Sequence, residues 1–238
     1  MSWDGSDELK IVAFDFDGVI FDGESVAVEI GEKFGLGSQI RQTLFELLTW
    51  NITLKEAILK GGALWKGIKV DDVAKVSDNL HLRQGTLGTM KELKVHSYKL
   101  ALISSGLSQV TYNVVKKNLG LDYAFGNEAE IRKGVFTGRL VAPPVDANRK
   151  AEILKSIAKS EGLSTRSCAV IGNDPNDIPM MLLAGLRIGI NPHPAVAKVS
   201  KIVLEKISDL REILPHLVPP EKGLPEDGKN VELNSCSR

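Results

Sequence analysis

The sequence has little of what marks a secreted, membrane-spanning or nucleic-acid-binding protein. Its two cysteines, Cys168 and Cys236, are too few for a disulfide framework and have no metal-ligand spacing. Thirty basic and thirty acidic residues cancel, which gives no electrostatic reason to expect nucleic acid or an anionic membrane as partner. No apolar run approaches membrane-spanning length, and the first ten residues lack an apolar signal core. We therefore expect a soluble cytoplasmic protein, and the sequence makes no prediction of its oligomeric state.

The apolar patterns that are present predict an α/β protein. The 238 residues, 43% of them hydrophobic, suffice for one large domain or for a core with a smaller inserted domain. Short apolar runs predict strands at residues 11–14, 99–103, 168–171, 186–190 and 201–204. Helical spacing predicts helices at residues 110–119, 147–159 and 209–217 and a short one from residue 195. Because strands alternate with helices, we predict a Rossmann-like parallel sheet core flanked by helices.

The segment between the first two predicted strands has a different character. Apolar residues such as Val26, Ile30 and Phe34 recur at helical spacing, and glycine-containing breaks separate about four short helices. We interpret residues 22–82 as an inserted all-helical cap, in which Trp50 and Trp65 are packing residues. Residues 129–141 alternate and predict a β-hairpin. The Rossmann-like catalytic core is then residues 1–21 and 83–218, and residues 219–238 form a flexible tail.

Two carboxylates follow the first predicted strand. Asp15 and Asp17 are two residues apart, so their side chains lie on the same side of an extended backbone, and Gly18 allows a tight exit from the strand. Such a pair is tolerable when a divalent cation, a shared proton or hydrogen bonds compensate it. The alternative is an ordinary solvated turn, for which Asp and Gly are common residues. We interpret the stretch as a magnesium-assisted phosphoryl-transfer site.

Polar residues follow two other predicted strands, and the carboxyl ends of parallel strands meet at one edge of the sheet. In this interpretation Asp15 is the nucleophile and Asp17 the acid and base, while Ser104 donates to the phosphoryl oxygens and Lys150 supplies a fixed cation. The predicted metal ligands are Asp15, Asp17, Asn173, Asp174 and Asp177. Each of these residues also has a simpler interpretation when it is considered alone. Ser104 and Ser105 could be helix caps, Lys150 could be a solvated surface lysine, and residues 172–177 could form an ordinary turn.

With these residues assembled, the chain resembles the haloacid dehalogenase superfamily of phosphatases, and its phosphoserine phosphatase branch most closely. The resemblance covers residues 10–204. It rests on DFDGV around Asp15, ISSG around Ser104, DANRKAEIL around Lys150 and GNDPNDIPMM around Asn173. It implies obligate magnesium, a Rossmann-like core and a helical cap that closes over the substrate. The predicted substrate-binding residues are Glu24, Ser105, Gly106 and Asn176.

The chain departs from that family pattern in two places. The fourth motif usually begins Gly-Asp, and here Asn173 stands in place of the acidic residue, so it offers a neutral carbonyl oxygen. The phosphoserine branch also holds its amino acid with an acidic residue, which Glu24 matches, and with a cap arginine. At the arginine position stands Lys60-Gly61-Gly62, and lysine is a poor substitute for a bidentate carboxylate clamp.

The sequence therefore predicts a hydrolase of phosphoric monoesters: a magnesium-dependent phosphomonoesterase that acts on a small phosphorylated metabolite through an aspartyl-phosphate. Phosphoserine is one candidate substrate. One alternative is a phosphotransferase that uses the same intermediate. Others are a receiver-like signalling module or a non-catalytic phospho-ligand-binding protein. A receiver-like module is about half this length, lacks the helical insertion and needs no leaving-group acid such as Asp17.

Overall fold

The computed structural model describes residues 8–23, 25–109, 113, 116–117 and 119–218. Its centre is a six-stranded sheet with the order β3-β2-β1-β6-β7-β8, and every neighbouring pair is parallel. The strands of this sheet are β1 (Ile11–Phe14), β2 (Lys99–Leu107), β3 (Tyr123–Asn127), β6 (Cys168–Gly172), β7 (Leu186–Ile190) and β8 (Ile202–Leu204). The carboxyl ends of the strands therefore share one edge, as predicted.

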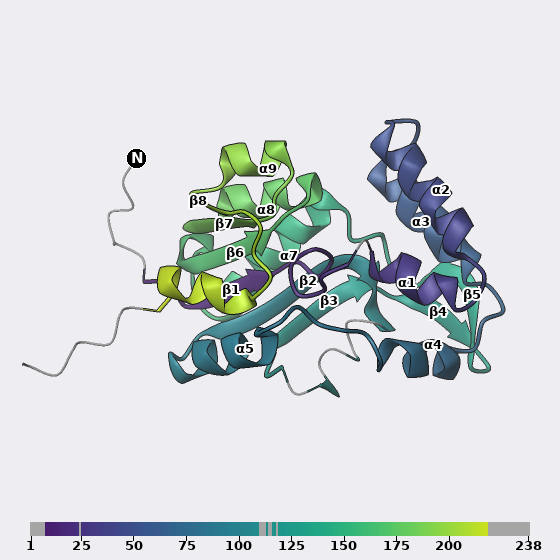
Figure 1. Ribbon diagram of the computed structural model, residues 1–238, viewed down its shortest axis with the longest axis horizontal. Coiled ribbons are helices and arrows are strands. Elements are labelled where there is room, and N and C mark those ends of the chain that lie inside the picture. The colour runs from purple at the N-terminus through teal and green to yellow at the C-terminus, as the bar shows by residue number, and fades with distance from the viewer. Residues whose placement is uncertain (1–7, 24, 110–112, 114–115, 118, 219–238) are drawn as a thin grey trace, which may run out of the picture.

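Helices cover both faces of this sheet (Figure 1). On one face lie α7 (Ala147–Ser160), α8 (Ile178–Leu183) and α9 (Pro194–Val199). The opposite face carries α5 (Thr86–Val95) and the 3₁₀ helix η3 (Leu210–His216). Two further 3₁₀ turns, η1 (Thr165–Ser167) and η2 (Pro175–Asp177), flank β6. This arrangement confirms the predicted parallel sheet flanked by helices.

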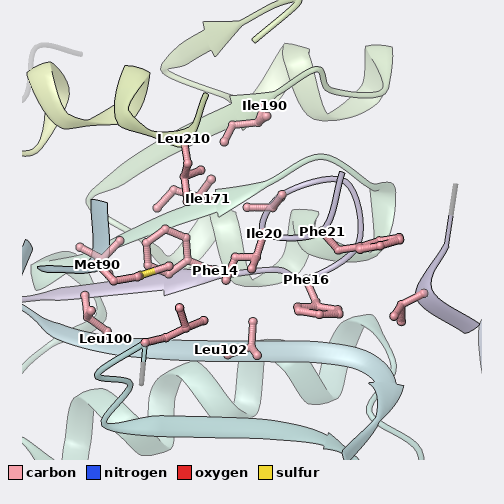
Figure 2. Close-up of a cluster of buried hydrophobic side chains, with 14 of the residues drawn as sticks. Phe14, Phe16, Ile20, Phe21, Met90, Leu100, Leu102, Ile171, Ile190 and Leu210 are labelled. Carbon is pink, nitrogen blue, oxygen red and sulfur yellow. The ribbon is translucent and has the colours of Figure 1, made fainter. Parts of the chain in front are cut away.

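Alternation along β1 produces the two apolar layers that hold the sheet between its helices. Ile11 and Ala13 pack in the cluster on the α7 side, whereas Val12 and Phe14 pack in the cluster on the α5 side. All four side chains are fully buried. Figure 2 shows part of the second layer, where Phe14 lies among Met90, Leu100, Ile171 and Leu210. A central strand buried on both faces fixes the position at which Asp15 leaves the sheet.

Four helices lie in the segment predicted as a cap: α1 (Val26–Glu32), α2 (Gly37–Leu48), α3 (Leu54–Leu64) and α4 (Val70–Ser77). Beside them lies the antiparallel hairpin of β4 (Ala129–Arg132) and β5 (Val135–Leu140), confirmed at its predicted position. Backbone hydrogen bonds join the two parts: Gly67 donates to the carbonyl of Phe136, and Phe136 donates to that of Ile68. The α2–α3 pair stands away from the sheet in Figure 1.

Several elements differ from the predicted pattern. α5, α8 and β3 were not predicted from periodicity, β2 continues beyond residue 103, and the last predicted helix is the 3₁₀ segment η3, which contains Pro215. Trp65 is buried, but Trp50 is 91% exposed and does not pack as expected. Most of the predicted helix at 110–119, the predicted tail at 219–238 and Cys236 lie outside the described residues. The domain boundaries at residues 22 and 83 stay a prediction.

Within the described part of the chain, none of the helices combines the length and the apolar character that crossing a membrane requires.

Candidate active site

The end of β1 places both carboxylates of the first motif at the edge of the sheet. The amide of Asp15 donates to the carbonyl of Ile171 in β6 at 3.0 Å, which keeps this residue in the sheet. The chain then turns tightly, because the Phe16 carbonyl accepts from the amides of three later residues, 19, 20 and 21. The carboxylate of Asp17 accepts from the amide of Val26 at the start of α1, at 2.8 Å. Asp17 is thus tied to the first inserted helix.

Lys150 joins two parts of the site that are far apart in the sequence. Its Nζ donates to Oδ1 of Asp15 at 2.7 Å and to Oδ1 of Asp177 at 2.8 Å. The Lys150 side chain is fully buried, as is that of Asp177, and Asp15 is 5% exposed. Lys150 lies in the first turn of α7, whose N-terminus is capped by Asp146. Lys150 is therefore not a solvated surface lysine, so the alternative interpretation of this residue is wrong.

Asp177 organises the turn after β6. Its Oδ2 accepts from the amides of Asn173 at 3.0 Å and Asp174 at 3.1 Å, while its Oδ1 holds Lys150. The carboxylate lies over Gly172, where a Cβ would come within 2.6 Å of it. Both oxygens of Asp177 therefore already accept hydrogen bonds from other residues of the protein. Asn173 and Asp174 are less buried than Asp177, so their side chains are the ones in this turn that a ligand can reach.

A close contact joins the first motif to this turn. Gly18 has φ of +73°, and a Cβ at this position would lie 2.2 Å from Nδ2 of Asn173. Only glycine takes this conformation without strain, and only a residue without a side chain leaves room for the amide. The turn after Asp17 and the turn after β6 therefore pack directly against each other, which brings the acidic residues of both motifs together.

The site carries more negative than positive charge. Burial and the charge of Asp177 raise the pKa of Asp15 to about 7, and Lys150 offsets only part of this. Burial raises the pKa of Asp17 to about 6, although the hydrogen bond from the Val26 amide lowers it. Burial also raises the pKa of Asp174. Burial alone would lower the pKa of Lys150, but the carboxylates of Asp15 and Asp177 outweigh it and raise this pKa above its ordinary value. A bound cation, or a proton on one of the carboxylates, would reduce this excess of negative charge.

The oxygen atoms present fit a hard divalent cation. The amide oxygens Oδ1 of Asn173 and Asn176 are buried and accept no hydrogen bond within the described residues. A buried acceptor without a donor is costly unless a ligand completes it. No three carboxylate, imidazole or thiol groups of the described chain are arranged to hold a metal by themselves. A metal here would therefore need the neutral oxygen of Asn173 beside the carboxylates, and water.

The end of β2 forms the third side of the site. Ser104 is buried, and its Oγ accepts from the amide of Gly106 at 2.9 Å. The hydroxyl of Ser105 donates instead to the carbonyl of Val145 at 2.7 Å. Asn127, at the end of β3, donates to the Ser105 carbonyl at 2.5 Å and accepts from the Val145 amide at 2.7 Å. These bonds fix the Ser104 segment to the chain that leads into α7.

The structure thus brings together most of the residues predicted for the site. Asp15, Lys150 and Asp177 form one hydrogen-bonded cluster, and Gly18 packs against Asn173. Ser105 reaches toward the chain before α7, so its substrate-binding role stays a prediction. Glu24 lies outside the described residues. The sequence did not predict the role of Asn127. Its partners are backbone groups, which every residue has, so no sequence pattern marks them. Its strand does lie in a segment that resembles the family.

The chain is similar in sequence and in fold to known hydrolases. The sequence matches the model of the haloacid dehalogenase-like hydrolases over residues 12–182. It is 32% identical over 208 residues to a phosphoserine phosphatase of Methanocaldococcus jannaschii, covering 87% of this chain and 97% of that protein. It is 33% identical to one of Archaeoglobus fulgidus, covering 85% of this chain and 56% of that protein. A solved structure described as a phospho-aspartyl intermediate analogue of phosphoserine phosphatase is similar with a TM-score of 0.78 and 31% identity, covering 89% of this chain and 100% of that one.

Proposed function

The chain belongs to the haloacid dehalogenase-like hydrolase family, and on that basis we propose that it is a magnesium-dependent phosphomonoesterase that works through an aspartyl-phosphate on Asp15. Membership confirms the predicted family and the predicted class, a hydrolase of phosphoric monoesters. The proposed substrate is a small phosphorylated metabolite, with phosphoserine as the first candidate. Residues 22–82 are proposed as the cap over this site. A cytoplasmic location stays a prediction from composition.

One observation carries the proposal: the buried ammonium of Lys150 between the carboxylates of Asp15 and Asp177. A carboxylate that attacks a phosphate dianion meets charge repulsion, so a fixed cation beside the nucleophile stabilises the approach. Lys150 also orients Asp15 by engaging one of its oxygens. Asp177 in turn holds Lys150 in place and shapes the turn that carries Asn173.

The proposed reaction has two steps that share one acid and base. Asp15 attacks phosphorus, the ester oxygen departs with the proton of Asp17, and an aspartyl-phosphate forms. Asp17 then takes a proton from water, which attacks phosphorus and releases inorganic phosphate and free Asp15. In the metal-free protein, burial raises the pKa of Asp17 above its ordinary value, which favours the protonated carboxyl that the first step needs.

Other groups would hold the phosphoryl oxygens. Ser104 and the amide of Gly106 lie at the end of β2. The Ser104 hydroxyl only accepts in its bond with Gly106, so it keeps its own proton to donate to a phosphoryl oxygen, whereas the Gly106 amide can donate there once it releases Ser104. Magnesium, when bound, supplies positive charge for the phosphate and for the acidic cluster. Its proposed ligands are the side chains of Asp15, Asn173 and Asp174 and the backbone carbonyl of Asp17, which leaves the Asp17 carboxyl available for proton transfer. Asp177 is proposed to act through Lys150 and the turn, because both its oxygens are engaged.

Phosphoserine is supported by the relatives but not by every local feature. Lys60, at the position where the branch carries an arginine, pairs with Glu46 across α2 and α3. This pairing competes with binding a substrate carboxylate. A panel that contains phosphoserine and phosphate esters without the amino-acid group, assayed with magnesium and with EDTA, tests both the reaction and the substrate.

Two variants test the assigned roles. Asp15→Asn is expected to abolish magnesium-dependent hydrolysis of phosphoserine and of an aryl phosphate. Asp17→Asn is expected to slow turnover strongly and keep substrate binding. Asp78→Asn, which changes an exposed carboxylate at the end of α4, is the matched control and should keep full activity. Normal turnover by Asp15→Asn would remove Asp15 as nucleophile. Product analysis with added alcohols distinguishes hydrolysis from phosphotransfer.

A further inference from the structure

A buried arginine, Arg83, binds the turn that directly follows Asp17, the proposed acid and base. The side chain of Arg83 is 1% exposed, and its partners Val19 and Ile207 belong to the apolar layer on the α5 side. Its Nη2 donates to the carbonyl of Gly18 and its Nε to that of Val19, both at 2.8 Å. Its Nη1 donates to the carbonyl of Ile207 at 2.8 Å. One planar guanidinium thus holds two consecutive carbonyls of the turn that follows Asp17.

Arg83 also lies where the chain returns from the inserted helices. Its backbone amide donates to the carbonyl of Ile20 at 2.7 Å, and Phe21 forms an antiparallel bridge with Leu82. Its Nη2 pairs with Asp22 at 2.8 Å. The chain entering the insertion and the chain leaving it are therefore joined by both backbone and side-chain bonds. A buried charge needs such partners, because an unpaired guanidinium in an apolar layer is strongly destabilising.

The turn that Arg83 binds constrains the position of the Asp17 carboxylate in two ways. Gly18, whose carbonyl Arg83 binds, directly follows Asp17 and packs against Asn173. Asp17 itself is bonded to the amide of Val26, beyond the same turn. A shift of residues 18–22 would therefore move the Asp17 carboxylate relative to Asp15, whose own position is fixed by β6 and Lys150.

We propose that Arg83 is a positioning residue for proton transfer: by binding the carbonyls of Gly18 and Val19 it holds Asp17 in line with the leaving oxygen. This inference rests on the proposed phosphatase function. Arg83 does not touch the substrate in this proposal and acts only through the turn. Lysine at this position keeps the charge but cannot bond two adjacent carbonyls from a planar fork.

The test compares two substrates that need the acid to different degrees. An alkoxide such as that of serine is a poor leaving group and needs a proton from Asp17, whereas p-nitrophenolate leaves without one. The rate to compare is kcat/KM, which covers the steps up to formation of the aspartyl-phosphate and leaves out its hydrolysis, a step that both esters share. For Arg83→Lys, kcat/KM with phosphoserine should fall at least about tenfold further than kcat/KM with p-nitrophenyl phosphate, a fraction of the 10²–10⁴ that general acid catalysis contributes. If phosphoserine is not the natural substrate, a simple alkyl phosphate that the wild type accepts takes its place.

A control and a double variant separate positioning from stability. Arg187 also donates from Nε to a carbonyl, that of Val199 at 2.7 Å, but on the far side of the sheet. Arg187→Lys should change both rates equally. If Arg83 acts through Asp17, then Arg83→Lys should add little to the loss in the Asp17→Asn background. Circular dichroism and thermal unfolding of each variant show whether it is folded.

Each outcome decides one question. Equal losses with both esters, or an undiminished effect in the Asp17→Asn background, would overturn the role of Arg83. If Arg83→Lys does not fold, Asp22→Asn, which removes the charged partner on the exposed side of the turn, is measured with the same pair of esters, and equal losses there overturn the proposal as well. A wild type that hydrolyses neither ester would contradict the proposed function instead.

Discussion

The Nζ of Lys150 lies 2.7 Å from Oδ1 of Asp15, although 135 positions separate the two residues in the chain. A second bond, to Asp177 at 2.8 Å, completes a buried triad of one cation and two carboxylates. The triad retains an excess of negative charge, and Asp17 adds to it. Both the reaction and the stability of the site follow from this imbalance.

Loss of the Lys150 ammonium should damage both activity and stability. Lys150→Met leaves two carboxylates buried without their cation, and we expect unfolding free energy to fall by about 3–5 kcal/mol at neutral pH. Turnover should fall by about 10² or more, the usual cost of removing a group that stabilises charge in the transition state. Urea unfolding and steady-state kinetics measure the two effects. Lys155→Met, on the exposed face of the same helix, should change neither. Full activity in Lys150→Met would contradict its role.

The charge of Asp15 should make the metal-free protein less stable as pH rises. The pKa of Asp15 is raised from 3.8 to about 7 in the folded state, so folding favours its protonated form. That stabilisation is present at low pH and is lost as pH rises from about 4 to 7. Asp15→Asn cannot lose this proton. Its stability relative to wild type, measured by unfolding in EDTA, should therefore increase across that range and level off above it. A difference that is independent of pH would contradict the raised pKa.

A carboxylate at position 173 should strengthen metal binding. Asn173 offers one neutral oxygen, and Asn173→Asp adds a full charge in a nearly identical shape. We expect the half-saturating magnesium concentration to fall about tenfold or more, because charge on the ligands sets affinity for hard cations. The thermal stabilisation by magnesium over EDTA should also increase. Asn79→Asp, an exposed change at the end of α4, is the control. Unchanged or weaker binding in Asn173→Asp would remove Asn173 from the ligand set.

The contact between Gly18 and Asn173 can be tested with a matched glycine. Gly18 and Gly35 have nearly the same φ, +73° and +71°, but a Cβ at Gly35 meets nothing within 4 Å. Both alanine variants carry the strain of the left-handed conformation, about 1–2 kcal/mol. Only Gly18→Ala should also displace Asn173. We expect it to lose more stability and to need more magnesium for activity. Equal behaviour of the two variants would show that the contact does not matter.

The sequence predicts five of the six strands of the sheet from short apolar runs, and it predicts the inserted helices from the helical spacing of their apolar residues. It misses α5, in which Leu87 and Val95 are exposed and break the amphipathic pattern. β2 is predicted to end at residue 103, but pairing with β3 extends it through small polar residues that carry no strand signal. In each case a tertiary contact, and not local propensity, decides the structure.

The site was predictable where chemistry is carried by charged side chains and unpredictable where it depends on backbone partners. Asp15, Asp17 and Lys150 stand in motifs that point to their chemistry. Asn127 and Arg83 bind carbonyls and amides, which every residue has, so no pattern in the sequence marks them. Asp177 was predicted as a metal ligand, and only the folded structure shows that one of its oxygens binds Lys150 and the other binds the amides of the turn.

Chemical trapping of the phosphorylated enzyme tests the central claim most directly. The Asp17→Asn variant, mixed with magnesium and an aryl phosphate that leaves without acid assistance, should accumulate the acyl-phosphate, because its hydrolysis lacks a base. Borohydride reduces an aspartyl-phosphate to homoserine, which peptide mass spectrometry locates. We predict homoserine at position 15 and at no other aspartate. Turnover of the substrate with unmodified Asp15, or with the label at a different residue, would contradict the assignment of Asp15 as the nucleophile.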